Sequence, residues 1–242
     1  MKRTAPLLAL AALALAASSA MAQVNLVQNP SFETVSAQTI NGVALTDAPT
    51  SWTQTGSNGC GFESLATGQT PTNGGDFTIG TNADNPSNGA RILISDMGPS
   101  NVTCQVFQDV AIPAGASSAI LSLDAGYTFI NSGTPGSSVS VAVTTTGGVP
   151  LASVYTRTDV QGNDPLATRT VNLNAFRGQT VRIIGTVTVP ASNWSGLELD
   201  NVRLLAVVAP AAVPTLSPWS VAALCILLGL AGAWAMRTSR RA

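Results

Sequence analysis

The amino-acid sequence predicts an all-β domain, most simply a jelly-roll β-sandwich, with an apolar segment at each end of the chain. Short alternating or β-branched runs follow one another through the middle of the chain, and turn-forming residues separate them. The same region contains no convincing amphipathic helix with a 3.6-residue period. Many short strands joined by tight turns are typical of β-sandwiches and jelly rolls. Asn-Gly pairs, which readily form such turns, occur at residues 41–42, 58–59, 73–74 and 88–89.

The first 22 residues have the parts of a secretory signal peptide. Lys2 and Arg3 precede an apolar core at residues 5–17, and Ala20-Met21-Ala22 forms a small-x-small cleavage site. The apolar core is too short for a membrane-spanning helix, which needs about 20 residues. We therefore expect cleavage after Ala22 and export of the rest of the chain.

The domain itself is expected at residues 23–205. In residues 138–144 the valines fall on one face and smaller residues on the other, as in a half-buried antiparallel strand. Gly185 interrupts another run and predicts a bulge or a bend. Residues 67–88 are polar and rich in turn formers, so we expect a long surface loop there. The predicted strands are residues 90–95, 102–110, 119–124, 139–144, 168–173, 180–189 and 197–205.

The charged residues exclude several functions. Residues 23–212 contain 6 arginines and all 12 acidic residues, which gives 6 − 12 = −6, so nucleic acid is not an expected partner. Histidine is absent, which excludes Ser-His-Asp and Cys-His catalysis and the HExxH zinc site. Carboxylate chemistry, or no catalysis at all, remains open.

Two of the three cysteines, Cys60 and Cys104, lie in the exported domain, and Cys225 lies in the apolar tail. An oxidising compartment favours a disulfide between Cys60 and Cys104. Two buried free thiols are the alternative, because pairing does not follow from sequence alone.

Both ends of the domain resemble a known group of sugar-binding folds. Residues 25–33 read NLVQNPSFE and are followed by Trp52, and residues 196–204 read GLELDNVRL. This combination resembles carbohydrate-binding modules of families 4 and 9 and related galactose-binding-type sandwiches of exported bacterial proteins. Residues 176–181 also resemble the penultimate turn and strand of these folds. The resemblance implies a jelly roll whose first and last strands lie side by side.

The resemblance also implies a structural calcium ion where those two strands meet, with Glu33 and Asp200 at the matching positions. Two neighbouring carboxylates would need such a cation to offset their repulsion. The alternative is that Glu33 is a solvated charge at a strand end and Asp200 a turn residue.

Sugar binding in such folds uses exposed aromatic rings as platforms. Trp194 lies in a polar loop before the last strand and is the better candidate, although a packed cap over the end of the sandwich would explain it equally well. Trp52 is the weaker candidate, since core packing near the first strand explains it better.

The tail after the domain has the composition of a tethered membrane segment. Residues 206–212 form a small-residue, proline-containing linker, and residues 219–236 carry no charge and are just long enough to span a membrane as a helix. Arg237, Arg240 and Arg241 follow directly, which places the C-terminus in the cytoplasm by the positive-inside rule. The unprocessed chain is thus expected to be a type I membrane protein.

The start of this tail carries a second signal. Its residues, Val213, Pro214, Thr215, Leu216, Ser217, Pro218 and Trp219, resemble the IPTL-CTERM sorting signal, with Val213 in place of the usual isoleucine. In that signal the motif is followed by an apolar helix and an arginine-rich end, as at residues 213–242 here. The resemblance implies recognition by an exosortase-type transpeptidase, cleavage near the motif and delivery to the surface or exterior of a Gram-negative bacterium.

Together these features predict an exported, non-enzymatic surface or matrix protein whose domain binds polysaccharide or another envelope component. A carboxylate-dependent glycan-active enzyme is one alternative, since a glycosidase needs only two acids at a defined separation. A purely structural matrix subunit is the other.

Overall fold

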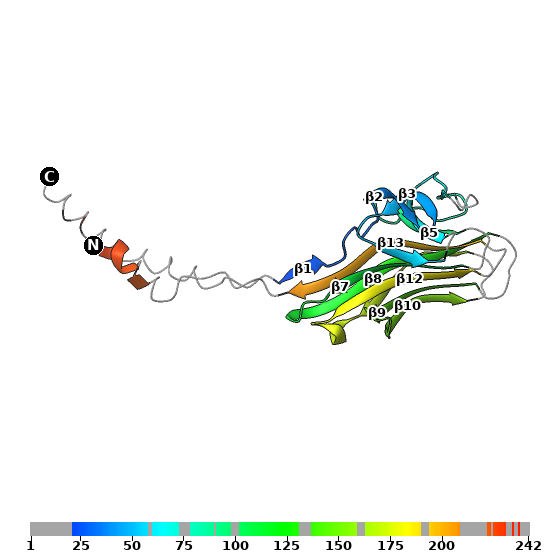
Figure 1. The fold of residues 1–242 in the computed structure, drawn as a ribbon. Helices are drawn as coiled ribbons and strands as arrows, with labels where there is room; N and C mark the ends of the chain where they lie inside the picture. The colour runs from blue at the N-terminus through cyan, green and yellow to red at the C-terminus, as the bar shows by residue number, and fades with distance from the viewer. Residues whose placement is uncertain are drawn as a thin grey trace. The chain divides into compact units, whose positions relative to one another are not determined.

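The chain of the computed structural model divides into two units, residues 21–209 and residues 1–20 with 210–242, and each is considered by itself. The described residues are 21–57, 60–72, 78–89, 91–97, 102–130, 137–158, 163–189, 194–208, 222–223, 225–230, 234 and 237. The first unit contains two large β-sheets and a small hairpin (Figure 1).

The larger sheet has six strands. Its order is β11 (Asp164–Asn172), β8 (Ala116–Ile130), β13 (Trp194–Val208), β6 (Arg91–Met97) and β5 (Cys60–Ala66), with β1 (Ala22–Asn25) paired to β13. The five-stranded sheet has the order β10 (Pro150–Thr158), β9 (Ser138–Thr145), β12 (Thr180–Val189), β7 (Val102–Ala111) and β4 (Thr53–Gly56). Neighbouring strands in both sheets are antiparallel. The remaining elements are the hairpin of β2 (Val35–Ile40) and β3 (Val43–Pro49) and the 3-10 turn η1 (Asn174–Phe176).

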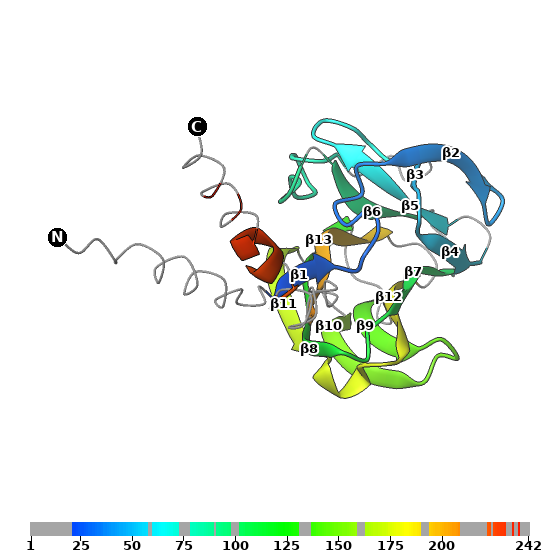
Figure 2. The ribbon, with the colours of Figure 1, turned by 90° about the vertical axis from the view of Figure 1, so that its left-hand side faces the viewer.

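The eight strands from β6 to β13 have the connectivity of a jelly roll. The order β6-β13-β8-β11 in one sheet faces the order β7-β12-β9-β10 in the other, so the chain crosses repeatedly between the sheets. Figure 2 shows the two layers nearly end-on. The predicted β-sandwich is thereby confirmed, and each of the seven predicted strand runs lies within or overlaps an observed strand.

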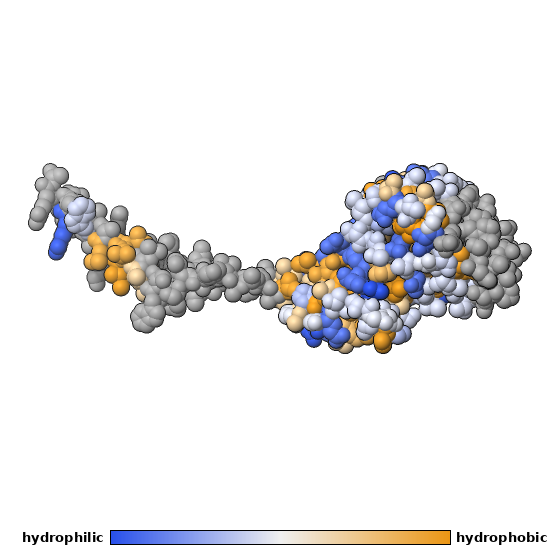
Figure 3. All heavy atoms as spheres, viewed as in Figure 1, coloured by the Kyte–Doolittle hydropathy of each residue, from blue (hydrophilic) through white to orange (hydrophobic). Residues whose placement is uncertain are grey.

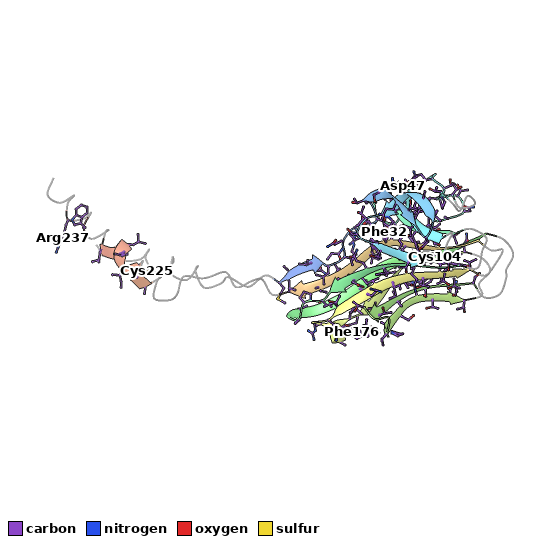
Figure 4. All side chains as sticks on the ribbon, in the orientation of Figure 1. Phe32, Asp47, Cys104, Phe176, Cys225 and Arg237 are labelled. Atoms are coloured by element: carbon purple, nitrogen blue, oxygen red, sulfur yellow. The ribbon has the colours of Figure 1, made fainter. Side chains whose placement is uncertain are left out.

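Alternation of apolar and polar residues explains why both sheets bury one face. In β7 the residues from Val102 to Val110 alternate regularly between buried and more exposed positions, and β12 does the same. Phe32 and Phe62 are fully buried. The ring centroids of Phe32 and Trp52 are 5.2 Å apart. Phe32 lies where the start of the domain packs onto the sandwich (Figure 4).

Gly185 does not mark a bulge, contrary to the sequence-based expectation. The register of β12 runs without a shift past Gly185 against both β7 and β9. A Cβ at this position would lie 3.1 Å from the Leu197 and Leu199 side chains of the other sheet. The glycine therefore makes room for the facing layer of the core.

Residues 78–89 were expected to form part of a surface loop, but the structure packs them onto the outer face of the six-stranded sheet. Ile79 and Ala83 are buried in a second apolar cluster with Leu65, Ile92 and Ile94. The residues 78–89 are called the covering loop below. This loop turns the outer face of one sheet into a second buried layer.

The structure tests the two ends of the chain less directly. The predicted signal peptide, 1–22, lies almost entirely outside the described residues. The parts of the chain that the structure describes contain no helix long and apolar enough to cross a membrane. Within the predicted span 219–236, helix is assigned to residues 222–223, 225–230 and 234, and the other positions are outside the described residues.

Candidate functional site

Three buried carboxylates lie under the covering loop on the outer face of the six-stranded sheet. Glu198 and Asp200 alternate along β13 with Leu197 and Leu199, which face the main core, so the two acids point the other way. Asp124 on β8 is paired in register with Asp200. The covering loop lies over all three.

Backbone and hydroxyl donors of the covering loop satisfy these acids. Asp200 Oδ2 accepts hydrogen bonds from Ser87 N at 2.7 Å and Asn88 N at 2.9 Å. The Ser87 hydroxyl donates to Asp124 Oδ2 at 2.6 Å. Burial raises the pKa of Asp200, and the backbone N–H groups around it oppose that rise. The acids therefore hold the loop against the sheet.

The fourth acid, Asp84, belongs to the covering loop and meets Glu198. Asp84 N donates to Glu198 Oε1 at 3.2 Å, and Leu166 N donates to the Asp84 carboxylate. Glu198 is 1% exposed. Burial first, and the neighbouring Asp84 carboxylate second, raise the pKa of Glu198 to about 8. Glu198 is accordingly protonated in the folded protein at neutral pH.

The predicted calcium residues, Glu33 and Asp200, both contact the segment 87–91. Asp200 binds Ser87 and Asn88, while Glu33 Oε1 accepts a hydrogen bond from Arg91 N at 3.1 Å. Asp200 Oδ1 accepts from Asn201 N at 2.6 Å, so both of its oxygens already have protein donors. Among the described residues no group of three or more acidic or cysteine side chains is placed to hold a metal ion. These contacts give each carboxylate a role as a loop anchor without a cation, and calcium at Glu33 and Asp200 stays a prediction.

Two glycine substitutions test the contact of Glu33 with this segment. Gly89 and Gly148 have nearly equal positive φ angles, 84° and 87°. An added Cβ at Gly89 would lie 2.1 Å from Glu33 Oε1, whereas one at Gly148 would meet nothing within 4 Å. We expect Gly148→Ala to cost about 1 kcal/mol for the backbone conformation alone. Gly89→Ala should cost about 1 kcal/mol more, because Glu33 must give up its hydrogen bond.

Chemical denaturation measures both free energies of unfolding. In a Glu33→Ala background the extra penalty of Gly89→Ala should vanish, and an unchanged penalty there would place the strain elsewhere. Melting curves with calcium and with a chelator test the calcium prediction on the same proteins. Calcium at 100 times its dissociation constant would add about 2.7 kcal/mol. A response that Glu33→Gln removes would support the site.

The structure places the two candidate tryptophans differently. Trp52 is 6% exposed, and its indole N–H donates to the carbonyl of Asn29 at 3.3 Å. It is a core residue and offers no ring for ligand stacking. Trp194 begins β13, but its side chain lies outside the described residues, so its role as a platform stays a prediction.

The outer face of the five-stranded sheet is rich in hydroxyl and amide groups, a feature that the sequence-based analysis did not single out. Thr103 and Thr188 are 3.3 Å apart across β7 and β12, and Gln105 bonds to Thr186 at 3.4 Å in the next row. In register with these residues, β9 adds Ser138 and Ser140. The space-filling view shows mostly pale and blue atoms over these strands, with apolar atoms scattered between them (Figure 3). Serine and threonine alternating with buried valine are the signal that predicts such a face.

One end of this face carries a fixed arginine. Arg182 on β12 binds Asp109 on β7 through two hydrogen bonds, Nε to Oδ1 at 2.7 Å and Nη2 to Oδ2 at 2.9 Å. Its guanidinium carbon lies 3.8 Å from the centroid of the Phe107 ring. The hydrogen bond from Arg182 lowers the pKa of Asp109. Ring, guanidinium and carboxylate thus form a rigid stack, called the Phe107 stack below.

A groove of about 430 Å³ adjoins the Phe107 stack, where β7 continues past the first residue of β4, Thr53. Gln108 on β7 fixes the opposite wall, which contains Gln28 and Ser51. Its side chain accepts a hydrogen bond from Gln28 N and donates to the carbonyls of Gln28 and Ser51. The groove is lined by Leu26, Gln28, Ser51, Thr53, Phe107, Gln108, Asp109, Val110 and Ala111. Polar groups next to a fixed planar stack are the features that orient small polar ligands in protein sites.

The cysteines are described in part. Cys104 is 1% exposed and disulfide-bonded, and Cys225 is a free, exposed thiol. The side chain of Cys60 lies outside the described residues, so its pairing with Cys104 stays a prediction.

Comparison with known proteins identifies the tail. Residues 211–240 match the family model of the IPTL-CTERM motif, which confirms the sorting signal predicted at residues 213–242. The motif marks an exported protein with a C-terminal sorting signal. In the structure, Val213, Pro214, Thr215, Leu216, Ser217 and Trp219 lie outside the described residues, as do Arg240 and Arg241, whereas Arg237 is described as helical.

The chain also has similarities to solved structures. TmCBM61, determined in complex with beta-1,4-galactotriose, has a TM-score of 0.44 and 14% identity over 75% of this chain and 97% of its own. A cyclase from Fischerella sp. TAU gives 0.44 and 18% over 78% of this chain and 100% of its own. The K3 adhesin domain of Lys-gingipain from Porphyromonas gingivalis w83 gives 0.42 and 12% over 76% and 99%. No curated protein matches the chain.

Proposed function

We propose that the chain is a Gram-negative surface or matrix protein that an exosortase-type transpeptidase sorts after export, and that its sandwich domain binds polysaccharide without catalysis. The match of residues 211–240 to the IPTL-CTERM motif is the observation that carries the sorting part. Before processing, the apolar tail and its arginines hold the protein in the inner membrane as a type I precursor.

The outer face of the five-stranded sheet supports polysaccharide binding. Its rows of hydroxyl and amide side chains match the hydrogen-bonding groups of sugars, and the Phe107 stack supplies a flat, immobile surface beside the groove. Because Asp109 fixes the guanidinium, little side-chain entropy is lost when a ligand packs on it.

The arrangement of the acids supports a non-catalytic domain. A glycosidase needs two carboxyl groups that reach its substrate. Asp84 lies beside Glu198, which has a raised pKa, yet the Asp84 carboxylate accepts from Leu166 N, Asp84 N donates to Glu198, and Glu198 is 1% exposed. Their role in holding the loop is sufficient to explain their burial.

Affinity electrophoresis of the full chain in non-ionic detergent tests the binding site. The chain is run through gels that contain neutral or acidic polysaccharides, after a glycan array has chosen the polymers. We expect Phe107→Ala and Arg182→Ala each to weaken retention at least about tenfold, or about 1.4 kcal/mol, because each removes half of the stack. Arg203→Ala, an exposed arginine on β13, is the control with the same charge change. Retention that no variant alters would move the binding site away from this face.

A further inference from the structure

A polar cluster separate from the Phe107 stack closes the open side of the sandwich between the edge strands β10 and β11. In the five-stranded sheet, β10 is at the opposite edge from β4, where the groove lies. Tyr155 and Arg157 on β10 are in register with the core residues Val141 and Val139, so they lie on the core-facing side of their sheet. On β11, Asp164 and Arg169 are in register with the core residues Tyr127 and Leu123. The four side chains therefore meet where the two sheets part.

A single carboxylate oxygen of Asp164 contacts all three neighbouring side chains. Its Oδ2 accepts a hydrogen bond from the Tyr155 hydroxyl at 2.8 Å and lies 3.1 Å from Arg157 Nε and 3.8 Å from Arg169 Nη2. Arg169 also lies over the Tyr155 ring, at 5.2 Å from its centroid. Among the described residues, two guanidinium groups thus share one carboxylate, so this cluster has one positive charge in excess. The domain as a whole has a negative net charge.

The two arginines also have Nε–H donors that face no water and make no hydrogen bond. The Nε atom of Arg169 is shielded from solvent and has no hydrogen-bond partner among the described residues. Arg157 Nε is shielded as well, and its 3.1 Å contact with Asp164 Oδ2 is an ion pair without hydrogen-bond geometry. A buried donor without an acceptor costs about 1–3 kcal/mol. An incoming oxyanion would relieve that cost and balance the excess charge at the same time.

The space for such a group is present. A hollow of about 420 Å³ is lined by Val154, Tyr155, Thr156, Arg157, Asp164 and Arg169. This hollow is called the edge pocket. Its volume lies in the range of small-molecule sites, and planar guanidinium groups match a planar carboxylate through paired hydrogen bonds.

We propose that the edge pocket binds the carboxylate of a uronic-acid residue in an acidic polysaccharide. The inference rests on the proposed polysaccharide binding and specifies its ligand class. Arg157 and Arg169 are the binding residues, Tyr155 supports Arg169 with its ring and donates to Asp164, and Asp164 holds both arginines in place until the ligand oxygen arrives. A cluster that served only as a plug, closing the open side of the sandwich, would need one arginine to neutralise its one carboxylate. The second arginine indicates a further role.

Nuclear magnetic resonance of the arginine side chains tests the pocket with a defined probe. Galacturonate is titrated into the full chain in non-ionic detergent at constant ionic strength, with galactose as the neutral counterpart. We expect galacturonate to shift the Nε–H signals of Arg157 and Arg169 and to leave that of the exposed Arg203 in place, while galactose shifts none of them. Equal shifts at all three arginines, or none, would mean that the pocket does not select a carboxylate.

Retention by polygalacturonate then links the pocket to the polymer. Arg157→Gln and Arg169→Gln should each reduce retention at least about tenfold, since each removes one charged donor set, and Arg203→Gln should change it less than about twofold. Asp164→Asn should increase retention several-fold, because it removes the carboxylate that competes with the ligand. The plug interpretation is favoured instead if Asp164→Asn only lowers the melting temperature and both arginine variants behave like the control.

These outcomes separate the pocket from the proposed function. Galacturonate shifts without retention by any polymer would refute polysaccharide binding and keep the pocket. Retention by neutral and acidic polymers alike, unaffected by Arg157→Gln and Arg169→Gln, would refute the pocket and keep polysaccharide binding.

Discussion

Glu198→Gln is expected to raise the melting temperature above pH 7 and to remove most of its dependence on pH. The wild-type carboxyl group is buried beside Asp84, and its pKa in the folded protein is about 8, compared with an ordinary value of 4.5. Glutamine has the shape of the protonated acid. Its oxygen can accept the hydrogen bond from Asp84 N, and its amide can donate to the Asp84 carboxylate.

The sign of the pH effect follows from proton binding. Between pH 4.5 and about 8 the folded protein keeps a proton on Glu198 that the unfolded chain has lost. Stability therefore falls as the pH rises through this range, and the stabilisation is complete only below the unfolded pKa. Each pKa unit corresponds to about 1.4 kcal/mol, so the wild-type protein should lose at least that amount between pH 5 and pH 8.

Thermal or urea unfolding at several pH values measures this difference. Asp84→Asn is the matched control, because it removes the neighbouring charge but leaves Glu198 buried; it should reduce the pH dependence without abolishing it. Stability that rises from pH 5 to pH 8 in the wild-type protein, and rises in the same way in Glu198→Gln, would contradict the buried protonated acid.

The sequence predicted the sandwich but only part of what surrounds it. Alternation in β7, β9 and β12 depends on local residues, so these strands were predictable. The hairpin of β2 and β3 was not predicted, although Asn41-Gly42 with φ values of 50° and 82° forms its turn. Its strands carry little alternation of apolar and polar residues, so the turn was the only local signal.

The buried acids were beyond local reasoning. Alternation in residues 197–200 places Glu198 and Asp200 on one face and the two leucines on the other, which indicates a solvent-exposed acidic face. The face is covered because residues 78–89 return to it, more than 100 positions away in the chain. A contact at that separation depends on the whole fold. For the same reason the edge pocket, whose arginines come from two different sheets, left no motif in the sequence.

The largest expected effect concerns the tail. Replacing Pro214, Thr215 and Leu216 together by alanine should leave export and membrane insertion intact but trap an unprocessed precursor in the inner membrane. Insertion depends on apolar length and on the arginines that follow, and the substitution changes neither. Recognition by the transpeptidase depends on the motif, which lies within the match at residues 211–240. The expected result is therefore loss of essentially all surface protein with little loss of total protein.

A second variant separates sorting from anchoring. Changing Arg237, Arg240 and Arg241 together to glutamine removes the basic end but keeps the motif. Because those charges fix the orientation of the segment, this protein should lose its topology or pass through the membrane, which differs from orderly trapping. Mass spectrometry of the C-terminal peptide from surface material distinguishes the two functions of the tail. If the tail is a sorting signal, the mature protein ends near residues 214–216 and lacks residues 219–242. If surface protein from a host that has the transpeptidase still ends at Arg241-Ala242, the tail is a permanent anchor, and sorting by cleavage is refuted.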